Sequence, residues 1–417
     1  MNLDRIEEIE LLAVLRTMLS SNNKFAEALR YYGVEPPTKI STKTGKTAFA
    51  FAKSDLGLTE LLDHPDERVR ALVEARLAIK TSIAETRAQR FIDMSNNGAA
   101  PVYLKYWGAE QTGRMSGGDK MNWQNLGRTV KGQIGLRDTV HAPEGYTLVV
   151  GDSANIEART VCWIAGQEDI LEKYRNGEDL YCDMAADVYG RPVTKTDKTE
   201  RMLGKIAVLG LGYGMGKKKF FATVTGPQWK VDIEQAVTDR AVNIFRSKYD
   251  KVSEFWRYQN DVVIPAMADG KTLYADSRGI LTTTQYGLLL PNGRTLRYPD
   301  LHQRKNEDPD SPFKTEWVFH IREGSRVIKT RTYGGHLTEN ICQALARIVV
   351  MDQAVEISRR YKVVMLVHDE VVCCVPEEQA ELCKKFMLEV MRKTPEWATG
   401  LPLDAEVGSH KIYSQAK

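Results

Sequence analysis

The sequence predicts an α+β protein, and three patterns along the chain support this prediction. Apolar residues recur at helical spacing through most of residues 1–98. Short apolar runs at residues 148–150 and within residues 362–375 indicate buried strands. Residues 273–332 carry further strand-like runs and a hairpin-type Asn-Gly dipeptide. Helical and strand patterns therefore occupy largely separate stretches, as in α+β folds.

Length and composition indicate a multi-lobed globular protein. The chain has 417 residues, so we expect two or three lobes around a sizeable core. A net charge of +3 is too small to indicate a nucleic-acid partner by itself. No apolar run approaches bilayer-spanning length, and the N-terminus lacks the apolar core of a signal peptide. We therefore expect no membrane contact. The six cysteines show no CxxC pair and no zinc spacing, so we expect a reducing, cytoplasmic setting.

A basic stretch precedes the first predicted strand. Between residues 114 and 137 the chain has five basic residues and one acid, Asp119. The five are Arg114, Lys120, Arg128, Lys131 and Arg137. The amides Gln124 and Asn125 lie among them, next to a tryptophan. Cations mixed with amides and an aromatic ring suit a surface that touches backbone phosphates and base edges.

Asp152 follows the strand at residues 148–150, and a helical pattern starts at Ile156. An aspartate before a helix is most often its N-cap. The alternative is that Asp152 holds a cation at the end of the buried strand. The choice between them depends on whether a second carboxylate converges on the same point.

Asp369 is the candidate for that second carboxylate. It lies in the polar triplet His368-Asp369-Glu370 between two apolar runs, which predicts a β-hairpin with polar residues at its turn. Alone, the triplet is most simply an exposed turn. If the hairpin lies beside the strand of Asp152, both carboxylates converge. Two carboxylates without a cysteine or histidine ligand set favour Mg²⁺, which binds one or two carboxylates plus substrate phosphates.

Arg201, Lys205, Leu209 and Tyr213 follow one another at intervals of four. This spacing predicts a nearly continuous face on one helix. Two cations one turn apart at the start of a helix can grip a polyphosphate. The alternative is an ordinary amphipathic helix with exposed basic residues.

Taken together and in this order, the motifs resemble those of family A (bacterial polymerase I-like) DNA polymerases. Residues 152–159, DSANIEAR, resemble motif A, DxSxIExR. Residues 201–214 resemble motif B, RxxxKxxxxxxxYG, and His368-Asp369-Glu370 resembles motif C, HDE. The resemblance continues in TGRMS at residues 112–116, in NWQN at 122–125 and in ENICQALAR at 339–347. It covers nearly the whole chain and looks phage-type.

The resemblance implies a right-hand polymerase fold and an enzyme, a DNA-directed DNA polymerase. We expect residues 1–98 to form the thumb, 99–165 the first part of the palm, 166–334 the mainly helical fingers with a β-rich insertion, and 335–417 the second part of the palm. The stretch before the TGR motif is too short for the family's proofreading exonuclease, so we expect synthesis without one. Primer–template DNA and dNTPs are the implied partners, alongside a separate nuclease, helicase or primase. If the chain is phage-encoded, its setting is the host cytoplasm.

The resemblance also implies roles for the motif residues. Asp152 and Asp369 would hold two Mg²⁺ ions, for which Mn²⁺ can substitute. Arg201 and Lys205 would clamp the β- and γ-phosphates, with Lys205 as general acid, and Glu370 completes the catalytic set. Contacts to the incoming dNTP fall to Arg201, Lys205, Leu209, Tyr213, Glu157 and His368. Contacts to DNA fall to Arg114, Gln124, Asn125, Arg137, Arg159, Gly214 and Gln343.

Individual roles follow from the same resemblance. Glu157 would fill the space beside the sugar C2′ and exclude a 2′-hydroxyl. Arg114 and Gln343 would read the minor-groove acceptors at the primer terminus. Tyr213 would stack near the template base.

One departure and two rival functions qualify this picture. Leu209 occupies a motif B position where the family usually has an aromatic residue that packs on the incoming sugar. A single-subunit RNA polymerase shares the palm chemistry, but Glu157 argues against it because such an enzyme must admit the 2′-hydroxyl. An inactive DNA-binding accessory subunit would be expected to lack the carboxylates or the Arg201–Lys205 pair, and all of these are present.

Overall fold

The structure, a computed structural model, describes residues 14–40, 47–52, 55–79, 83–95, 99–118, 121–127, 135–226, 228–306, 313–323 and 326–416. Lys120, Arg128 and Lys131 of the basic stretch lie outside these ranges. The chain divides into two compact units, Met1–Pro101 and Val102–Lys417, and each is described by itself.

The first unit is mainly helical, as predicted. Residues 14–20 are helical, and the helices α2 (Asn22–Tyr31), α3 (Leu56–Thr59), α4 (Glu67–Ile79) and α5 (Ile83–Ser95) follow. Strands β1 (Thr38–Ile40) and β2 (Thr47–Phe49) pair antiparallel. The side chain of Ser21 caps α2 by accepting a hydrogen bond from the amide of Lys24. Phe25, Leu29 and Phe51 are buried in the core that holds this unit together.

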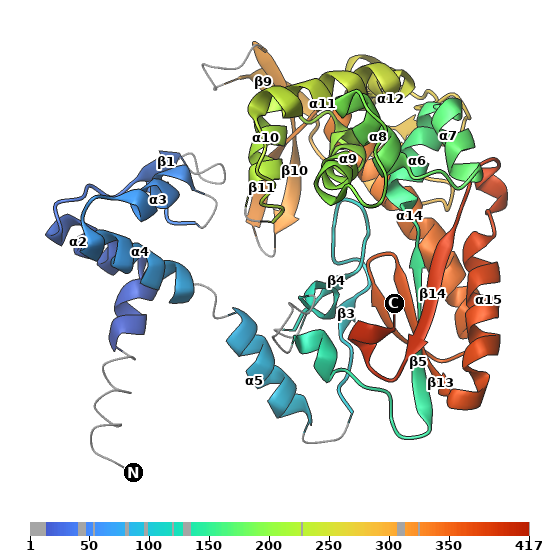
Figure 1. Cartoon of the computed structure of the whole chain (residues 1–417). Coiled ribbons are helices and arrows are strands. Elements are labelled where there is room, and N and C mark those ends of the chain that lie inside the picture. The colour runs from blue at the N-terminus through green and yellow to red at the C-terminus, as the bar shows by residue number, and fades with distance from the viewer. Residues whose placement is uncertain are drawn as a thin grey trace. The chain divides into compact units, whose positions relative to one another are not determined.

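A four-stranded antiparallel sheet forms the centre of the second unit (Figure 1). Its strands, in the order β12-β13-β5-β14, are β12 (Val363–Val367), β13 (Glu370–Pro376), β5 (Tyr146–Ser153) and β14 (Ala405–His410). The predicted strand and the predicted hairpin are therefore both present and lie side by side. The central position of β5 explains its apolar run, since Val149 and Val150 are fully buried.

Two long helices cover this sheet. Helices α14 (Gly334–Ser358) and α15 (Ala380–Arg392) pack on it through a buried cluster that includes Val149, Val371 and Met387. A Cβ atom on Gly151 would lie 2.6 Å from the Met391 sulfur, so α15 covers the face of β5 that Gly151 presents. Because successive strand residues point to opposite faces, Asp152 points away from α15.

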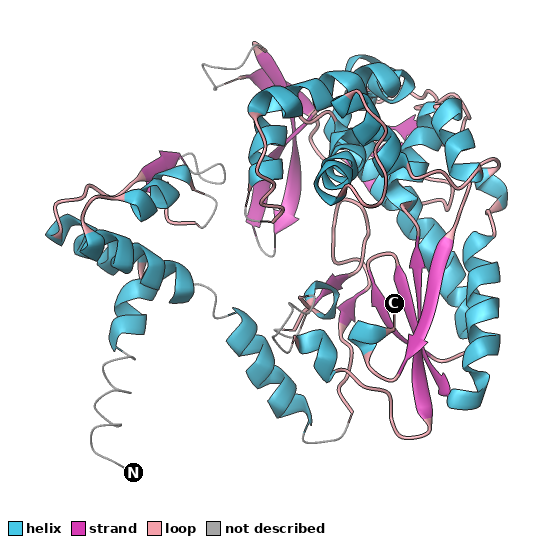
Figure 2. Cartoon of the chain, in the orientation of Figure 1, coloured by secondary structure: helices cyan, strands magenta, loops and turns pink. Residues whose placement is uncertain are grey.

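Between β5 and α14 the chain forms the predicted helical and then β-rich segment (Figure 2). The helices are α6 (Ile156–Ala165), α7 (Glu168–Arg175), α8 (Leu180–Tyr189), α9 (Lys198–Gly210), α10 (Lys217–Thr225), α11 (Gln235–Lys248), α12 (Asp250–Tyr258) and α13 (Ile264–Ala268). Two three-stranded sheets follow. They comprise β6 (Thr282–Thr284), β7 (Gly287–Leu289) and β8 (Thr295–Arg297), then β9 (His302–Lys305), β10 (Thr315–Glu323) and β11 (Arg326–Thr332). A large core cluster around Trp163, Leu203 and Phe245 joins these helices to α14.

A small sheet of β3 (Leu104–Lys105) and β4 (Ser116–Gly117) precedes the central strands. Short 3₁₀ turns follow at Trp123–Asn125 and Leu136–Thr139, and another closes the chain at Tyr413–Gln415.

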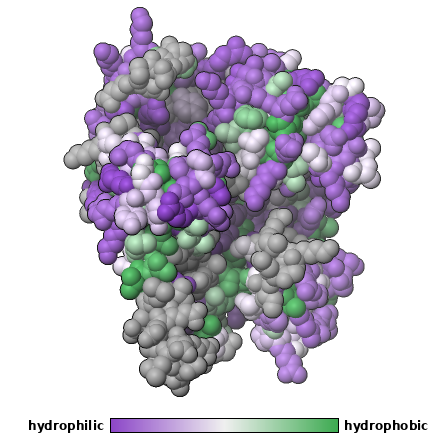
Figure 3. Space-filling view, turned by 60° about the vertical axis from the view of Figure 1, so that its left-hand side comes forward, coloured by the Kyte–Doolittle hydropathy of each residue, from purple (hydrophilic) through white to green (hydrophobic). Residues whose placement is uncertain are grey.

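The surface visible in Figure 3 is mostly hydrophilic, with hydrophobic residues in small patches between the polar ones. Among the described residues, none of the helices combines the length and the apolar character needed to cross a bilayer.

Helices α8 and α9 approach each other closely at Gly204. A Cβ atom added there would lie 2.0 Å from the carbonyl oxygen of Tyr181 in α8. We expect Gly204→Ala to push the helices apart and to lower the free energy of unfolding by about 1–3 kcal/mol. Gly210→Ala in the same helix is the control, because its Cβ would meet only Met215, at 3.9 Å. Denaturant unfolding measures both variants, and equal stabilities would contradict the close packing of α8 on α9.

Candidate active site

An open cleft of about 960 Å³ in the second unit gathers many of the predicted site residues. Those that line it are Arg114, Asp152, Glu157, Arg159, Arg201, Lys205, Leu209, His368 and Asp369. They come from β5, α6, α9, the β12–β13 turn and the segment before β4. Parts of the chain more than 200 residues apart in sequence thus meet around one space.

Asp152 and Asp369 converge because of the strand register. Glu370 lies directly opposite Asp152 in the β13–β5 pair, and the amide of Ser153 donates a 3.2 Å hydrogen bond to the Asp369 carbonyl. Burial, and then the neighbouring Asp152 carboxylate, raise the pKa of Asp369 to about 6. The helix N-cap is Asn155, so the alternative that Asp152 caps α6 is wrong.

The donor set fits a hard divalent cation. Two carboxylates offer only oxygen atoms, the ligands that Mg²⁺ prefers, and a cation between them would relieve their mutual repulsion. In the described part of the chain, no group of three or more histidine, cysteine, aspartate or glutamate side chains is placed to hold a metal ion. Asp152 and Asp369 would therefore leave most of the coordination sphere to substrate and water.

Glu370 is placed differently from its neighbour Asp369. Its side chain is only 2% exposed, and the hydroxyl of Tyr413 donates a hydrogen bond to its Oε1 atom. Directly opposite residues of an antiparallel pair share one face of the sheet, so Glu370 and Asp152 lie on the same face.

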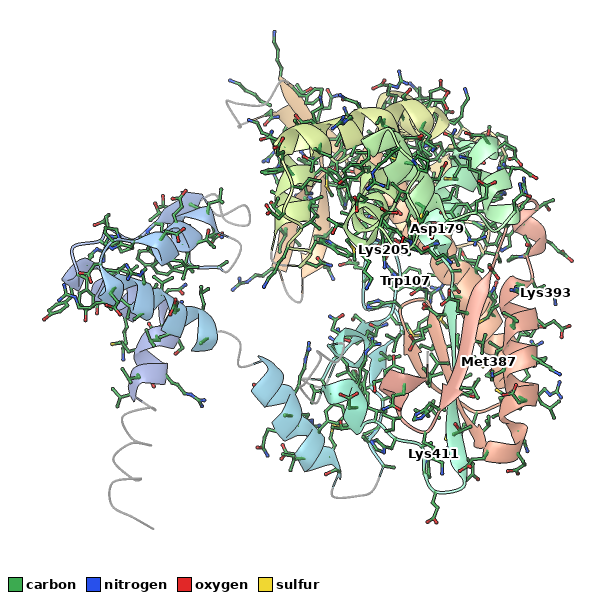
Figure 4. The ribbon with its side chains drawn as sticks, in the orientation of Figure 1. Trp107, Asp179, Lys205, Met387, Lys393 and Lys411 are labelled. Atoms are coloured by element: carbon green, nitrogen blue, oxygen red, sulfur yellow. The ribbon has the colours of Figure 1, made fainter. Side chains whose placement is uncertain are left out.

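Arg201 and Lys205 form the cationic part of the cleft, one turn apart on α9. Lys205 and Asp179, which caps the start of α8, are labelled in Figure 4. Nε and Nη2 of Arg201 each lie 2.9 Å from Oδ2 of Asp179. The Tyr181 ring lies near both cations, 5.2 Å from the Arg201 Cζ and 5.9 Å from the Lys205 Nζ. Burial lowers the pKa of Arg201, but the Asp179 carboxylate outweighs it and the pKa is raised overall. Arg201 is thus held charged and in a defined orientation.

The predicted four-residue face does not extend to Tyr213. Helix α9 ends at Gly210, and Leu211–Tyr213 forms a 3₁₀ turn that Gly214 closes with φ +78°. Tyr213 therefore leaves the face that Arg201, Lys205 and Leu209 share. Leu209 is 37% exposed and lines the cleft. The hydroxyl of Tyr213 is desolvated instead, and this burial raises the pKa of Tyr213 well above its usual range.

Arg114 and Glu157 form an ion pair with an Nη1–Oε1 distance of 2.8 Å. Each of the two side chains is 29% exposed, so the pair is accessible from the cleft. Gln343 on α14 donates a 3.2 Å hydrogen bond to Glu339. Burial raises the pKa of Glu339, and the Glu157 charge adds to this effect.

Gln124, Asn125 and Arg137, three other residues predicted to contact DNA, lie in different environments. Gln124 is buried, and its backbone hydrogen-bonds to the His368 ring, whose pKa is lowered by burial and by Arg114. Asn125 is exposed. Arg137 donates a hydrogen bond to the Leu126 carbonyl at 3.0 Å.

Arg159 is only 6% exposed, and its guanidinium donates to the carbonyls of Ala154 and Pro402 and packs on the Tyr174 ring. Its guanidinium thereby braces the β5–α6 turn. Arg159 also lines the cleft, and its contact with DNA stays a prediction.

Comparison with known proteins gives the family. The model of DNA polymerase family A matches residues 3–273, more than half of the chain. The chain belongs to DNA polymerase family A. The DNA polymerase of Bacillus phage SP02 is 27% identical over 91% of this chain and 63% of its own length. DNA polymerase I of Pseudomonas aeruginosa is 23% identical over 92% of this chain and 37% of its own length. The chain thus spans less than two thirds of these relatives.

A solved structure of a polymerase domain shares the fold. The POL domain of Pol1 from M. smegmatis superposes with a TM-score of 0.63 at 19% identity, covering 95% of this chain and 61% of that one. The α+β polymerase fold predicted from the motifs is therefore confirmed.

Sequence reasoning missed Asp179, Tyr181 and Tyr413. Asp179 accepts hydrogen bonds from the amides of Tyr181 and Cys182 and so caps α8. An aspartate at the start of a helical pattern is a visible capping signal. Its contact with Arg201 carries no local signal, because it depends on how α8 packs against α9.

We expect Asp179→Ala to destabilise the protein, because α8 loses its N-cap and Arg201 loses its partner. The loss should be about 1–3 kcal/mol. The control Asp269→Ala breaks an exposed pair with Lys271, in which the two side chains are 57% and 70% exposed, and should cost little. Thermal unfolding compares the two, and an equal stability of both variants would show that Asp179 has no structural role.

Proposed function

We propose that this chain is a template-directed DNA polymerase that adds dNTPs to a primer 3′-hydroxyl. The observation that carries the proposal is the placement of Asp152 and Asp369 in one cleft with Arg201 and Lys205. A pair of carboxylates for divalent cations beside two phosphate-binding cations is the arrangement that nucleotidyl transfer requires.

The relatives support this proposal. The proteins from Bacillus phage SP02 and Pseudomonas aeruginosa are both named DNA polymerases. The M. smegmatis domain was solved in complex with a DNA primer-template and a dNTP. We infer that this chain takes the same two partners.

Asp152 and Asp369 would hold two Mg²⁺ ions, with Mn²⁺ able to substitute. Bound there, divalent cations activate the primer hydroxyl and offset the charge that develops during phosphoryl transfer. The protein contributes the orientation of both carboxylates, which the β13–β5 register and the β12–β13 turn fix.

Arg201 and Lys205 would bind the β- and γ-phosphates, and Lys205 would protonate the leaving pyrophosphate. The Asp179 carboxylate accepts a hydrogen bond from Nε of Arg201 and forms an ion pair with its Nη2, which fixes the orientation of the guanidinium. The clamp is therefore oriented before the nucleotide arrives, so less entropy is lost on binding.

Glu157 and Arg114 would act at the base of the cleft as a linked pair. Glu157 would occupy the space beside the sugar C2′, while Arg114 and Gln343 would contact minor-groove acceptors of the terminal pair. This assignment favours a DNA polymerase over an RNA polymerase. We further propose that residues 1–98 act as the thumb, 99–165 with 335–417 as the palm, and 166–334 as the fingers.

Because Asp152 is proposed as a metal ligand, Asp152→Ala should abolish primer extension while duplex binding is preserved. We expect the single-nucleotide incorporation rate to fall by at least roughly 1,000-fold. Rapid-quench kinetics measures the rate and fluorescence anisotropy the duplex affinity, with Asp269→Ala as the matched control. Near-normal extension by Asp152→Ala would refute the metal assignment.

Glu157→Ala should admit ribonucleotides, because it removes side-chain bulk beside the sugar. We expect the ratio of rNTP to dNTP incorporation efficiency to rise roughly tenfold or more. Glu157→Gln keeps the bulk and removes only the charge, so its ratio should stay near that of the wild type. If both variants gain equally, charge rather than volume sets the selectivity, and the steric assignment is wrong.

A further inference from the structure

The last described segment of the chain is docked beside the carboxylates. After β14, the amide of Ala142 donates to the Lys411 carbonyl at 2.8 Å, and the amide of Tyr413 donates to the Val140 carbonyl at 3.0 Å. An isolated bridge also pairs His141 with Ile412. These backbone contacts hold the Tyr413–Gln415 turn against the Leu136–Thr139 turn and bury the Tyr413 side chain, which is 3% exposed.

The hydroxyl of Tyr413 is directed at Glu370. It donates a hydrogen bond to Oε1 of Glu370, whose side chain is only 2% exposed. A buried carboxylate needs hydrogen-bond partners, and a bond to a charged acceptor is stronger than one between neutral groups. Burial and the Glu370 charge raise the pKa of Tyr413 far above its usual value, so the hydroxyl keeps its proton for this bond.

Arg137 fixes the ring from a second side. Its Cζ atom lies 5.1 Å from the centroid of the Tyr413 ring, while its Nε donates to the Leu126 carbonyl at 3.0 Å. Leu126 directly follows Gln124 and Asn125, two of the residues predicted to contact DNA. The Arg137 guanidinium therefore contacts two protein groups, the Tyr413 ring and the Leu126 carbonyl.

We propose that Tyr413 is a positioning residue for Glu370, and that Arg137 acts through the Tyr413 ring rather than through DNA. The Glu370 carboxylate lies opposite Asp152 on one face of the sheet, so its orientation shapes the space in which the proposed cations bind. This inference rests on the proposed polymerase function. If it is correct, the Tyr413–Gln415 turn belongs to the active site through its contact with Glu370.

The main test is a double-mutant cycle of Tyr413→Phe with Glu370→Gln. Tyr413→Phe removes one oxygen and keeps the ring on Arg137. We expect the single-nucleotide incorporation rate to fall roughly tenfold, with the KM for dNTP and the Kd for duplex DNA unchanged. In the Glu370→Gln background, Tyr413→Phe should cause no further loss. Additive losses, or a wild-type rate for Tyr413→Phe, would overturn the proposal.

A second readout needs no primer. Mg²⁺ should raise the melting temperature of the wild type, and Tyr413→Phe should shift the half-maximal Mg²⁺ concentration upward severalfold. The control is Tyr298→Phe, which also removes a buried tyrosine hydroxyl. The Tyr298 hydroxyl accepts a 2.9 Å hydrogen bond from Asn340 and lies away from the cleft. An equal Mg²⁺ shift in both variants would show a general loss of stability and overturn the positioning role. If the wild type fails to extend primers, the proposed function falls, whereas the Mg²⁺ comparison still tests the role of Tyr413.

Arg137→Met tests whether Arg137 acts through the Tyr413 ring or through DNA. The variant removes the guanidinium and leaves the Tyr413 side chain unchanged. We expect a severalfold lower incorporation rate with an unchanged duplex Kd. A weakened duplex Kd at an unchanged rate would mean that Arg137 contacts DNA and would overturn its assignment.

Discussion

The antiparallel register between β13 and β5 is the constraint on which the site depends. It places Glu370 opposite Asp152, and the β12–β13 turn then brings Asp369 beside the end of β5. A slip of one residue would turn Asp152 toward α15. Gly151 opposes such a slip, because any Cβ at its position would lie 2.6 Å from the Met391 sulfur. The packing of α15 therefore also determines where Asp152 and Asp369, the proposed metal ligands, are placed.

The part of the cleft proposed to bind phosphates depends on a second close approach, between helices α8 and α9. Gly204 lets α9 lie against the backbone of α8, and this contact brings Asp179 and Tyr181 to Arg201 and Lys205. The two cations are held by a carboxylate and an aromatic ring before any nucleotide binds. The same principle applies at Glu370, which Tyr413 orients from the end of the described chain. In both places, residues outside the motifs set the geometry of residues within them.

The sequence was sufficient for features that carry a local signal. The β5 strand and the β12–β13 hairpin could be predicted because apolar runs and a polar triplet are visible along the chain. The roles of the motif residues came only from the resemblance to family A polymerases. The convergence of Asp152 and Asp369 needed the additional inference that the strands pair. Contacts between side chains distant in sequence could not be predicted, which is why Asp179 and Tyr413 were missed. The hydrogen bonds from the Arg159 guanidinium to two carbonyls could not be predicted for the same reason. Tyr213 was placed on the helix because its spacing fits, but α9 ends at Gly210.

The central claim is that one cleft holds the metal-binding carboxylates and the triphosphate-binding cations. A crystal structure of the chain with Mg²⁺, a primer–template ending in a dideoxynucleotide and the next dNTP tests this claim most directly. We expect the α-phosphate to lie beside Asp152 and Asp369, with the β- and γ-phosphates on Arg201 and Lys205. A triphosphate bound away from Asp369, or one that leaves Arg201 and Lys205 without phosphate contacts, would contradict it.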